Sequence, residues 1–271
     1  METYEEQQAF FNANWDDMRA AAEHGGAADV VRFIEGHSDD LERRVLYVFA
    51  HQELMNQEWA GRSLDVGIAV ADAGIAELLR QAEAAGDEET RRKRTDTANV
   101  ISYNLSADLA DCWPDDHLRR ERRHFELGLK AAQDCIRWRL ELDKGPGPFA
   151  IAYWAQGMHE LSLEDPHAAE DSFARSLEFA RLAAREAKLG EEVDADGDFG
   201  VILSAGYVGL ARMAGGRESG RELYEKASAA FALQLENPNL LEDAKFGLAQ
   251  LNTVRQRYTS AMPAAAGAPD A

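Results

Sequence analysis

The chain has 271 residues, with 29 Lys or Arg against 49 Asp or Glu, so its formal net charge is −20. A charge of this sign repels phosphate at long range and argues against nucleic acid as a partner. No run approaches about 18 apolar residues and the amino terminus is acidic, which argues against a membrane span, a membrane partner or a secretory signal and favours a cytoplasmic protein.

The spacing of apolar residues predicts an all-α fold. Apolar residues recur three and four positions apart, as at Leu41, Val45 and Val48, whereas the alternation typical of strands is not sustained anywhere. Gly, Pro and N-capping residues interrupt this pattern at intervals of helical length. We expect about eleven helices, at 4–23, 27–36, 40–58, 61–84, 88–112, 117–143, 149–163, 167–188, 199–214, 218–235 and 240–258.

The predicted helices suggest three regions along the chain. Residues 1–39 are expected to form an amino-terminal helical cap. Residues 40–258 are expected to form an array of antiparallel helix pairs, because the connections between the helices are short. Residues 259–271 combine small residues with two prolines and are predicted to be a disordered tail.

The chain contains two cysteines, Cys112 and Cys135. A single widely spaced pair fits neither a disulfide framework nor the spacing of zinc ligands. We expect both to be small core residues in a reducing compartment, since a reactive thiol needs an electropositive and partly exposed setting.

One pattern recurs in every second predicted helix: a small residue, an Ala or aromatic residue four positions later, and a small residue three further on. These positions share one helix face, where small residues allow a neighbouring helix to approach closely. The order of the copies in alternate helices indicates stacked helix pairs. The four copies are Gly67/Ala71/Gly74, Gly128/Ala132/Cys135, Ala169/Phe173/Ser176 and Gly220/Tyr224/Ala227.

The segment from Tyr153 to Ser176 resembles a tetratricopeptide repeat. The small Gly157 of a first helix, the Glu164-Asp-Pro turn, and the Ala, aromatic and small positions of the second helix follow that family's register. The resemblance covers residues 98–235 and, more loosely, 40–84. The uneven spacing of the copies and the lack of a terminal Pro in each repeat differ from the family. We therefore expect a diverged, tetratricopeptide-like α-solenoid, with other α-solenoids as the alternative.

The resemblance implies a concave groove lined by the first helices of the pairs. In this sequence the groove would be flanked by Tyr103, Asn104, Trp154, Met158 and Met213. Flexible Met and amphipathic aromatic side chains suit a peptide partner. The alternative is that these residues are ordinary core and that the amino-terminal helices fold over them.

The function expected from this architecture is that of a non-catalytic protein-interaction scaffold or adaptor. An acidic rim would select a basic or amphipathic protein or peptide, and self-association is a further expectation. The sequence has no catalytic serine elbow, phosphate-binding loop or zinc-protease motif, so we expect neither enzyme activity nor a cofactor. The alternative function is an all-α enzyme or small-ligand sensor with an enclosed site that uses His159 or Glu160.

Asp194, Asp196 and Asp198 resemble the start of a calcium loop, in which alternate oxygens converge on the ion. However, Gly197 lies one position early, and Ala205 stands where the bidentate Glu belongs. An N-cap and turn before the helix at 199–214 explain the same residues. We therefore expect no metal site.

Overall fold

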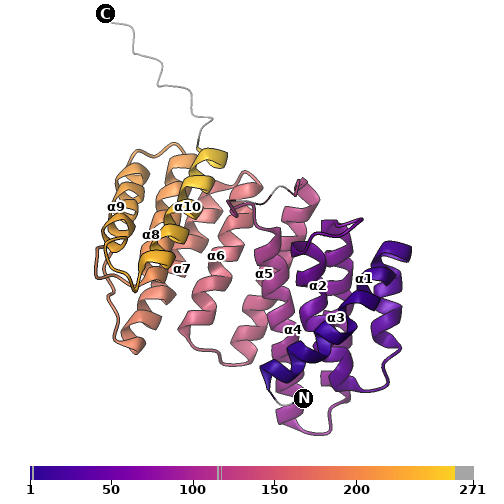
Figure 1. Ribbon diagram of the computed structural model, residues 1–271. Helices are drawn as coiled ribbons and strands as arrows, with labels where there is room; N and C mark the ends of the chain where they lie inside the picture. The colour runs from indigo at the N-terminus through magenta and orange to yellow at the C-terminus, as the bar shows by residue number, and fades with distance from the viewer. Residues whose placement is uncertain (2, 115, 117, 260–271) are drawn as a thin grey trace, which may run out of the picture. The chain divides into compact units, whose positions relative to one another are not determined.

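The structure is a computed structural model that describes residues 1, 3–114, 116 and 118–259. Within these residues it contains ten α-helices and no β-sheet, which confirms the predicted all-α fold (Figure 1). The tail prediction for 259–271 lies, except for Thr259, outside the described residues. No described helix is both long enough and apolar enough to span a membrane. The chain divides into two compact units.

Unit 1 consists of residues 1–109 and 130–143. Its helices are α1 (Tyr4–Glu35), α2 (Asp40–Asn56), α3 (Leu64–Ala84), α4 (Glu88–Leu109) and the second half of α5 (Arg122–Glu141). Helices α1 and α2 both pack against α3, and α3 packs against α4.

Helix α1 joins the two helices predicted at 4–23 and 27–36. The predicted break is present as a kink, because Gly25 and Gly26 have non-helical backbone angles. Gly26 has φ +64°, in the left-handed region that glycine adopts without a steric penalty. The interruption therefore changes the direction of one helix, and the structure has ten helices where about eleven were expected.

Unit 2 consists of residues 110–129 and the described residues from 144 onward. It contains the first half of α5, then α6 (Pro146–Ser162), α7 (Pro166–Ala187), α8 (Phe199–Ala214), α9 (Ser219–Gln234) and α10 (Leu241–Tyr258). From α6 to α10 each helix packs against the next, and α8 also contacts both α6 and α10. Helices α6, α8 and α10 therefore share one layer of this unit.

Several helix ends follow directly from the local sequence. Asp165 and Asp198 are the N-caps of α7 and α8, and their carboxylates accept backbone hydrogen bonds from Ala168 and Gly200. Helix α6 begins at Pro146, three residues before the predicted start. Proline lacks an N–H group and is pre-organised for the first turn of a helix, so the Gly-Pro-Gly-Pro stretch starts this helix instead of delaying it.

The four recurring triplets lie on α3, α5, α7 and α9, and all twelve residues are buried. Close helix contacts explain the glycines. A Cβ atom on Gly74 would lie 2.9 Å from the Tyr47 side chain, and one on Gly220 would lie 2.5 Å from the backbone oxygen of Gly209. The small residues therefore face neighbouring helices, as their spacing predicted.

Candidate functional site

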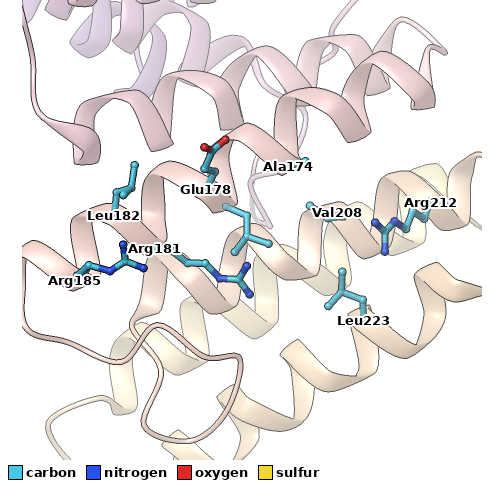
Figure 2. A pocket seen from close by; sticks show the side chains of 9 residues that line it. Ala174, Glu178, Arg181, Leu182, Arg185, Val208, Arg212 and Leu223 are labelled. Atoms are coloured by element: carbon cyan, nitrogen blue, oxygen red, sulfur yellow. The ribbon is translucent and has the colours of Figure 1, made fainter.

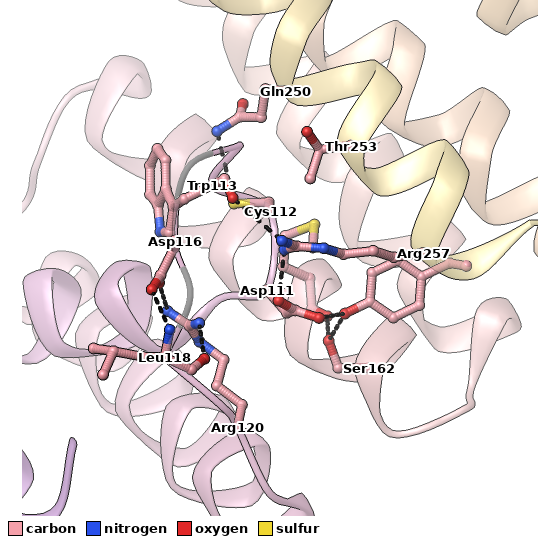
Figure 3. Close-up of polar contacts among 12 residues, drawn as sticks. Asp111, Cys112, Trp113, Asp116, Leu118, Arg120, Ser162, Gln250, Thr253 and Arg257 are labelled. Atoms are coloured by element: carbon pink, nitrogen blue, oxygen red, sulfur yellow. Dashed lines mark hydrogen bonds and ion pairs between the residues drawn. The ribbon is translucent and has the colours of Figure 1, made fainter. Parts of the chain in front are cut away.

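The connection between α4 and α5 follows α4 of unit 1 in sequence but belongs to unit 2. Its residues Asp111, Cys112 and Trp113 pack on the layer formed by α6, α8 and α10 and contact side chains of all three helices. We call these three residues the inner segment and the surface beneath them the inner face. Figure 3 shows their polar contacts.

Trp113 attaches the inner segment through aromatic contacts. Its ring lies 6.0 Å from that of Trp154 on α6, edge to face, and 6.2 Å from that of Phe246 on α10. Trp154 in turn meets Tyr207 of α8 at 6.1 Å in a second edge-to-face contact. Such pairs are favourable because the positive edge of one ring faces the negative surface of the next.

Asp111 and Trp113 are both held by Arg257, in the last turn of α10. The Arg257 guanidinium forms a 2.5 Å ion pair with the Asp111 carboxylate and donates a longer hydrogen bond to the Trp113 carbonyl oxygen. Tyr258 donates to the other Asp111 oxygen at 3.4 Å, and its hydroxyl also lies 2.7 Å from that of Ser162. Arg257 thus contacts both a side chain and the main chain of the inner segment.

Cys112 lies at the centre of the inner segment and is fully buried. The amide nitrogen of Gln250 donates to its sulfur at 3.6 Å. Burial raises the pKa of the Cys112 thiol, so it is protonated at neutral pH and unreactive. The expectation that the two cysteines are core residues is confirmed, since Cys135 is also buried.

The end of the connection folds back on itself. The Asp116 carboxylate accepts a hydrogen bond from the backbone N–H of Leu118 and forms an ion pair with Arg120, which also donates to the Leu118 carbonyl oxygen (Figure 3). The Arg120 side chain is nearly buried. This local turn precedes α5 and is joined to the inner segment by a 3.5 Å hydrogen bond from the backbone N–H of Asp116 to the Trp113 carbonyl oxygen.

A second candidate site is an open groove between α7 and α9, floored by α8, with a volume of about 390 Å³. We call it the α7–α9 groove. Its apolar surface comes from Leu177, Leu182, Val208 and Leu223. Leu182 is 37% exposed, although it is a large apolar residue. The α7 residues of the groove follow helical spacing and form one face of that helix.

Three arginines and one glutamate accompany these apolar residues: Arg181, Arg185, Arg212 and Glu178. Figure 2 shows Arg185 and Arg212 toward opposite ends of the groove, with Arg181 between them. Arg185 pairs with Glu191 at 2.6 Å, and Arg212 pairs with Glu170 at 2.8 Å. Arg181 donates only a long bond, 3.3 Å, to the Glu191 carbonyl oxygen among the hydrogen bonds of the described residues.

The five sequence-predicted groove residues are divided between the two units. In unit 1, Tyr103 is half-buried beneath the Arg139 guanidinium, 4.9 Å from its ring centre, and Asn104 is half-buried on the same helix. In unit 2, Trp154 is 8% exposed and Met158 is fully buried, which fits the core alternative. Met213 is half-buried near the end of α8.

The two polar residues of the enzyme alternative, His159 and Glu160, are buried on α6. The His159 ring fills the space above Gly128, where a Cβ atom would lie 2.2 Å away, and it also contacts Phe125. The Glu160 carboxylate accepts a hydrogen bond from Gln156, and burial raises its pKa. These contacts account for both residues by packing within unit 2.

Two of the three aspartates of the calcium-like loop accept hydrogen bonds from the backbone. Asp194 accepts a hydrogen bond from the N–H of Asp196, and Asp198 caps α8. Among the described residues, no three or more His, Cys, Asp or Glu side chains are grouped as metal ligands. The cap interpretation of Asp198 is therefore confirmed.

Sequence reasoning missed both surfaces. The signal for the inner segment was an acidic, aromatic stretch that ends in Trp113-Pro between two long helices, whereas the helix predicted at 88–112 includes Asp111 and Cys112. Arg181 and Arg185, four positions apart on α7, were a signal for the groove, but that spacing alone fits any solvated helix face. No protein-family model, curated protein or solved structure matches the chain.

Proposed function

We propose that this protein is a non-catalytic interaction scaffold, a diverged tetratricopeptide-like array that binds a helix of a partner protein in the α7–α9 groove. The observation that carries the proposal is the groove itself, which leaves an apolar strip of unit 2 open and borders it with arginines. Apolar grooves between helices are a common docking site for an amphipathic helix.

The recurring close contacts between helices of a pair support the tetratricopeptide-like part of the proposal. A Cβ atom on Gly157 of α6 would lie 2.6 Å from the ring of Phe173 on α7. In the next pair, a Cβ on Gly209 of α8 would lie 2.7 Å from the backbone of Tyr224 on α9. A small residue on a first helix thus meets the aromatic position of the second helix in both pairs, as the sequence register implies.

The charge of the groove defines the partner further. Three arginines and one glutamate line it. Arg185 and Arg212 are paired with Glu191 and Glu170, whereas Arg181 donates its hydrogen bond to a carbonyl oxygen and not to a carboxylate. A partner helix with an apolar stripe and flanking carboxylates would bury Leu182 and place negative charge near Arg181. The amphipathic partner expected from the sequence is retained, whereas at this site an acidic helix fits better than a basic one.

The proposal is tested by capturing partners from an extract of the source cells with the full chain and with Leu182→Glu. The charge would enter the apolar strip, so proteins captured by the wild type should be lost. Leu233→Glu is the matched control, because Leu233 is 57% exposed on α9 and does not line the groove. Equal capture by all three proteins, or loss with both variants, would contradict the proposal.

A further inference from the structure

The inner face of unit 2 has the chemistry of a peptide-binding site, and a stretch of the same chain covers it. We propose that this face binds a segment of a partner protein in the manner of the inner segment, and that the partner segment carries a carboxylate two residues before an aromatic ring. This inference does not depend on the α7–α9 groove, because none of the residues used to argue it lines that groove.

The first observation is that the inner segment is held by contacts that an intermolecular peptide could reproduce. Arg257 binds a carboxylate and a main-chain carbonyl oxygen two residues apart. The ring of Trp113 provides the aromatic contacts with Trp154 and Phe246. A charged clamp and an aromatic anchor are the two elements by which short peptides are commonly recognised.

The second observation lies beneath Cys112. The Tyr207 hydroxyl and the Trp154 indole nitrogen are buried near each other and near this thiol, and neither forms a hydrogen bond of ordinary geometry with another described residue, so each other and the Cys112 sulfur are their nearest polar contacts. Buried donors with only weak partners are unfavourable. An oxygen acceptor would satisfy them better than a thiol, which is a weak acceptor. The partner segment should therefore carry Ser or Asn between its acid and its aromatic residue.

The third observation is that the polar contacts of the inner segment are weak. The hydrogen bond from Tyr258 to Asp111 is long, 3.4 Å, and the one from Gln250 ends on the Cys112 sulfur, which is a weak acceptor. The ion pair between Asp111 and Arg257 is about one-third exposed, with side-chain exposures of 30% and 28%, where water and salt weaken it. The segment is also non-helical, so it can leave the face without unwinding a described helix.

The test uses the peptide Asp-Leu-Ala-Asp-Ser-Trp-Pro, which copies residues 108–114 with Ser in place of Cys112. The full chain carries Cys135→Ser, so that Cys112 is its one remaining thiol; serine can replace the Cys135 hydrogen bond to Asn99. Displacement of the inner segment exposes Cys112 to a thiol reagent. Saturating peptide should accelerate labelling about tenfold, a change equivalent to one aromatic contact. A control peptide with Ala in place of Trp should not accelerate the labelling of Cys112.

A second measurement covers the case in which the inner segment outcompetes the peptide. Asp111→Ala/Trp113→Ala removes both anchors from the chain and leaves the inner face intact. The fluorescent peptide should bind this variant at least about tenfold more tightly than the wild type, and addition of Arg257→Ala should reverse the gain. Circular dichroism verifies that each variant is folded, and Leu233→Glu is the surface control.

Accelerated labelling, or tight binding to the anchor-free variant that depends on Arg257, would support the inference. Unchanged labelling together with no preference of the peptide for the anchor-free variant would overturn it. The peptide and its readouts involve no residue of the α7–α9 groove, so this failure would leave the proposed function standing. Loss of partner capture by Leu182→Glu would likewise say nothing about the inner face.

Discussion

Two connections of unit 2 are stabilised in different ways. The connection between α7 and α8, residues 188–198, closes on itself: Gly190 and Gly197 form a β-bridge, and the N–H of Asp198 donates to the Gly190 carbonyl oxygen. The buried amide of Gln234 donates to the carbonyl oxygens of Ala195 and Gly197. The inner segment of the connection between α4 and α5 instead uses its side chains to contact three separate helices, α6, α8 and α10.

A loop held by its own backbone is a fixed part of the fold, whereas a loop held by side chains can be exchanged for a peptide. Backbone hydrogen bonds and a glycine bridge hold residues 188–198, and a separate peptide could not replace them without breaking the chain's own ladder. Side chains hold the inner segment, and a peptide with the same side chains would make the same contacts. If the comparison is right, substitutions in the first loop should lower stability most, and those in the second should mainly expose Cys112.

The largest effect is expected for Gly190→Ala. A Cβ atom there would lie 2.1 Å from the Asp196 carbonyl oxygen, so the loop must open. The free energy of unfolding should fall by about 3 kcal/mol, typical of overpacking that backbone movement has to relieve. Urea unfolding followed by circular dichroism measures the change. Gly145→Ala is the control, because nothing lies within 4 Å of its Cβ and the change should stay below about 1 kcal/mol.

Gln234→Ala should come next. The substitution removes the donor to two loop carbonyl oxygens, of half-buried Ala195 at 3.2 Å and of buried Gly197 at 2.8 Å. A buried acceptor left without a donor costs about 1–3 kcal/mol, so we expect the free energy of unfolding to fall by an amount near the middle of that range. Leu233→Ala, on the exposed side of the same helix, should be nearly neutral. A Gln234→Ala protein as stable as the wild type would show that the bridge alone holds the loop.

Trp113→Ala should lower stability by about 1–2 kcal/mol, because two aromatic contacts are lost from a half-buried ring. The same variant should label at Cys112 much faster than the wild type, whereas Trp113→Phe should restore most of both properties. Thermal unfolding and thiol labelling measure the two effects. A loss as large as that of Gly190→Ala without faster labelling would contradict the distinction between the loops.

The smallest effect is expected for Asp111→Asn. Its ion pair with Arg257 is partly exposed, so the substitution should change the free energy of unfolding by less than about 1 kcal/mol. The difference between the variant and the wild type should shrink as salt is added, since salt screens the charge pair. Urea unfolding at low and high ionic strength measures it. A salt-independent loss would mean that hydrogen bonding, and not charge, holds this residue.

Helix positions were predictable because their causes are local. The predicted helix 199–214 coincides with α8, and the prediction at 167–188 differs from α7 by one residue at each end. In both cases an Asp side chain caps the first turn, and the apolar residues keep helical spacing. The prediction failed where local spacing continued but the helix did not: α4 ends at Leu109 instead of residue 112, and α5 begins at Arg122 instead of residue 117.

The sequence by itself determined that this chain is helical, where most helices begin and end, and which small residues face a neighbouring helix. These properties depend on contacts within a few residues along the chain. Tertiary structure alone decided that Cys112 and Trp113 leave the end of α4 to pack on α6, α8 and α10, and that Trp154 and Met158 are covered. Periodicity shows which side chains share a face of a helix. It does not show whether a distant segment, a partner or water covers that face.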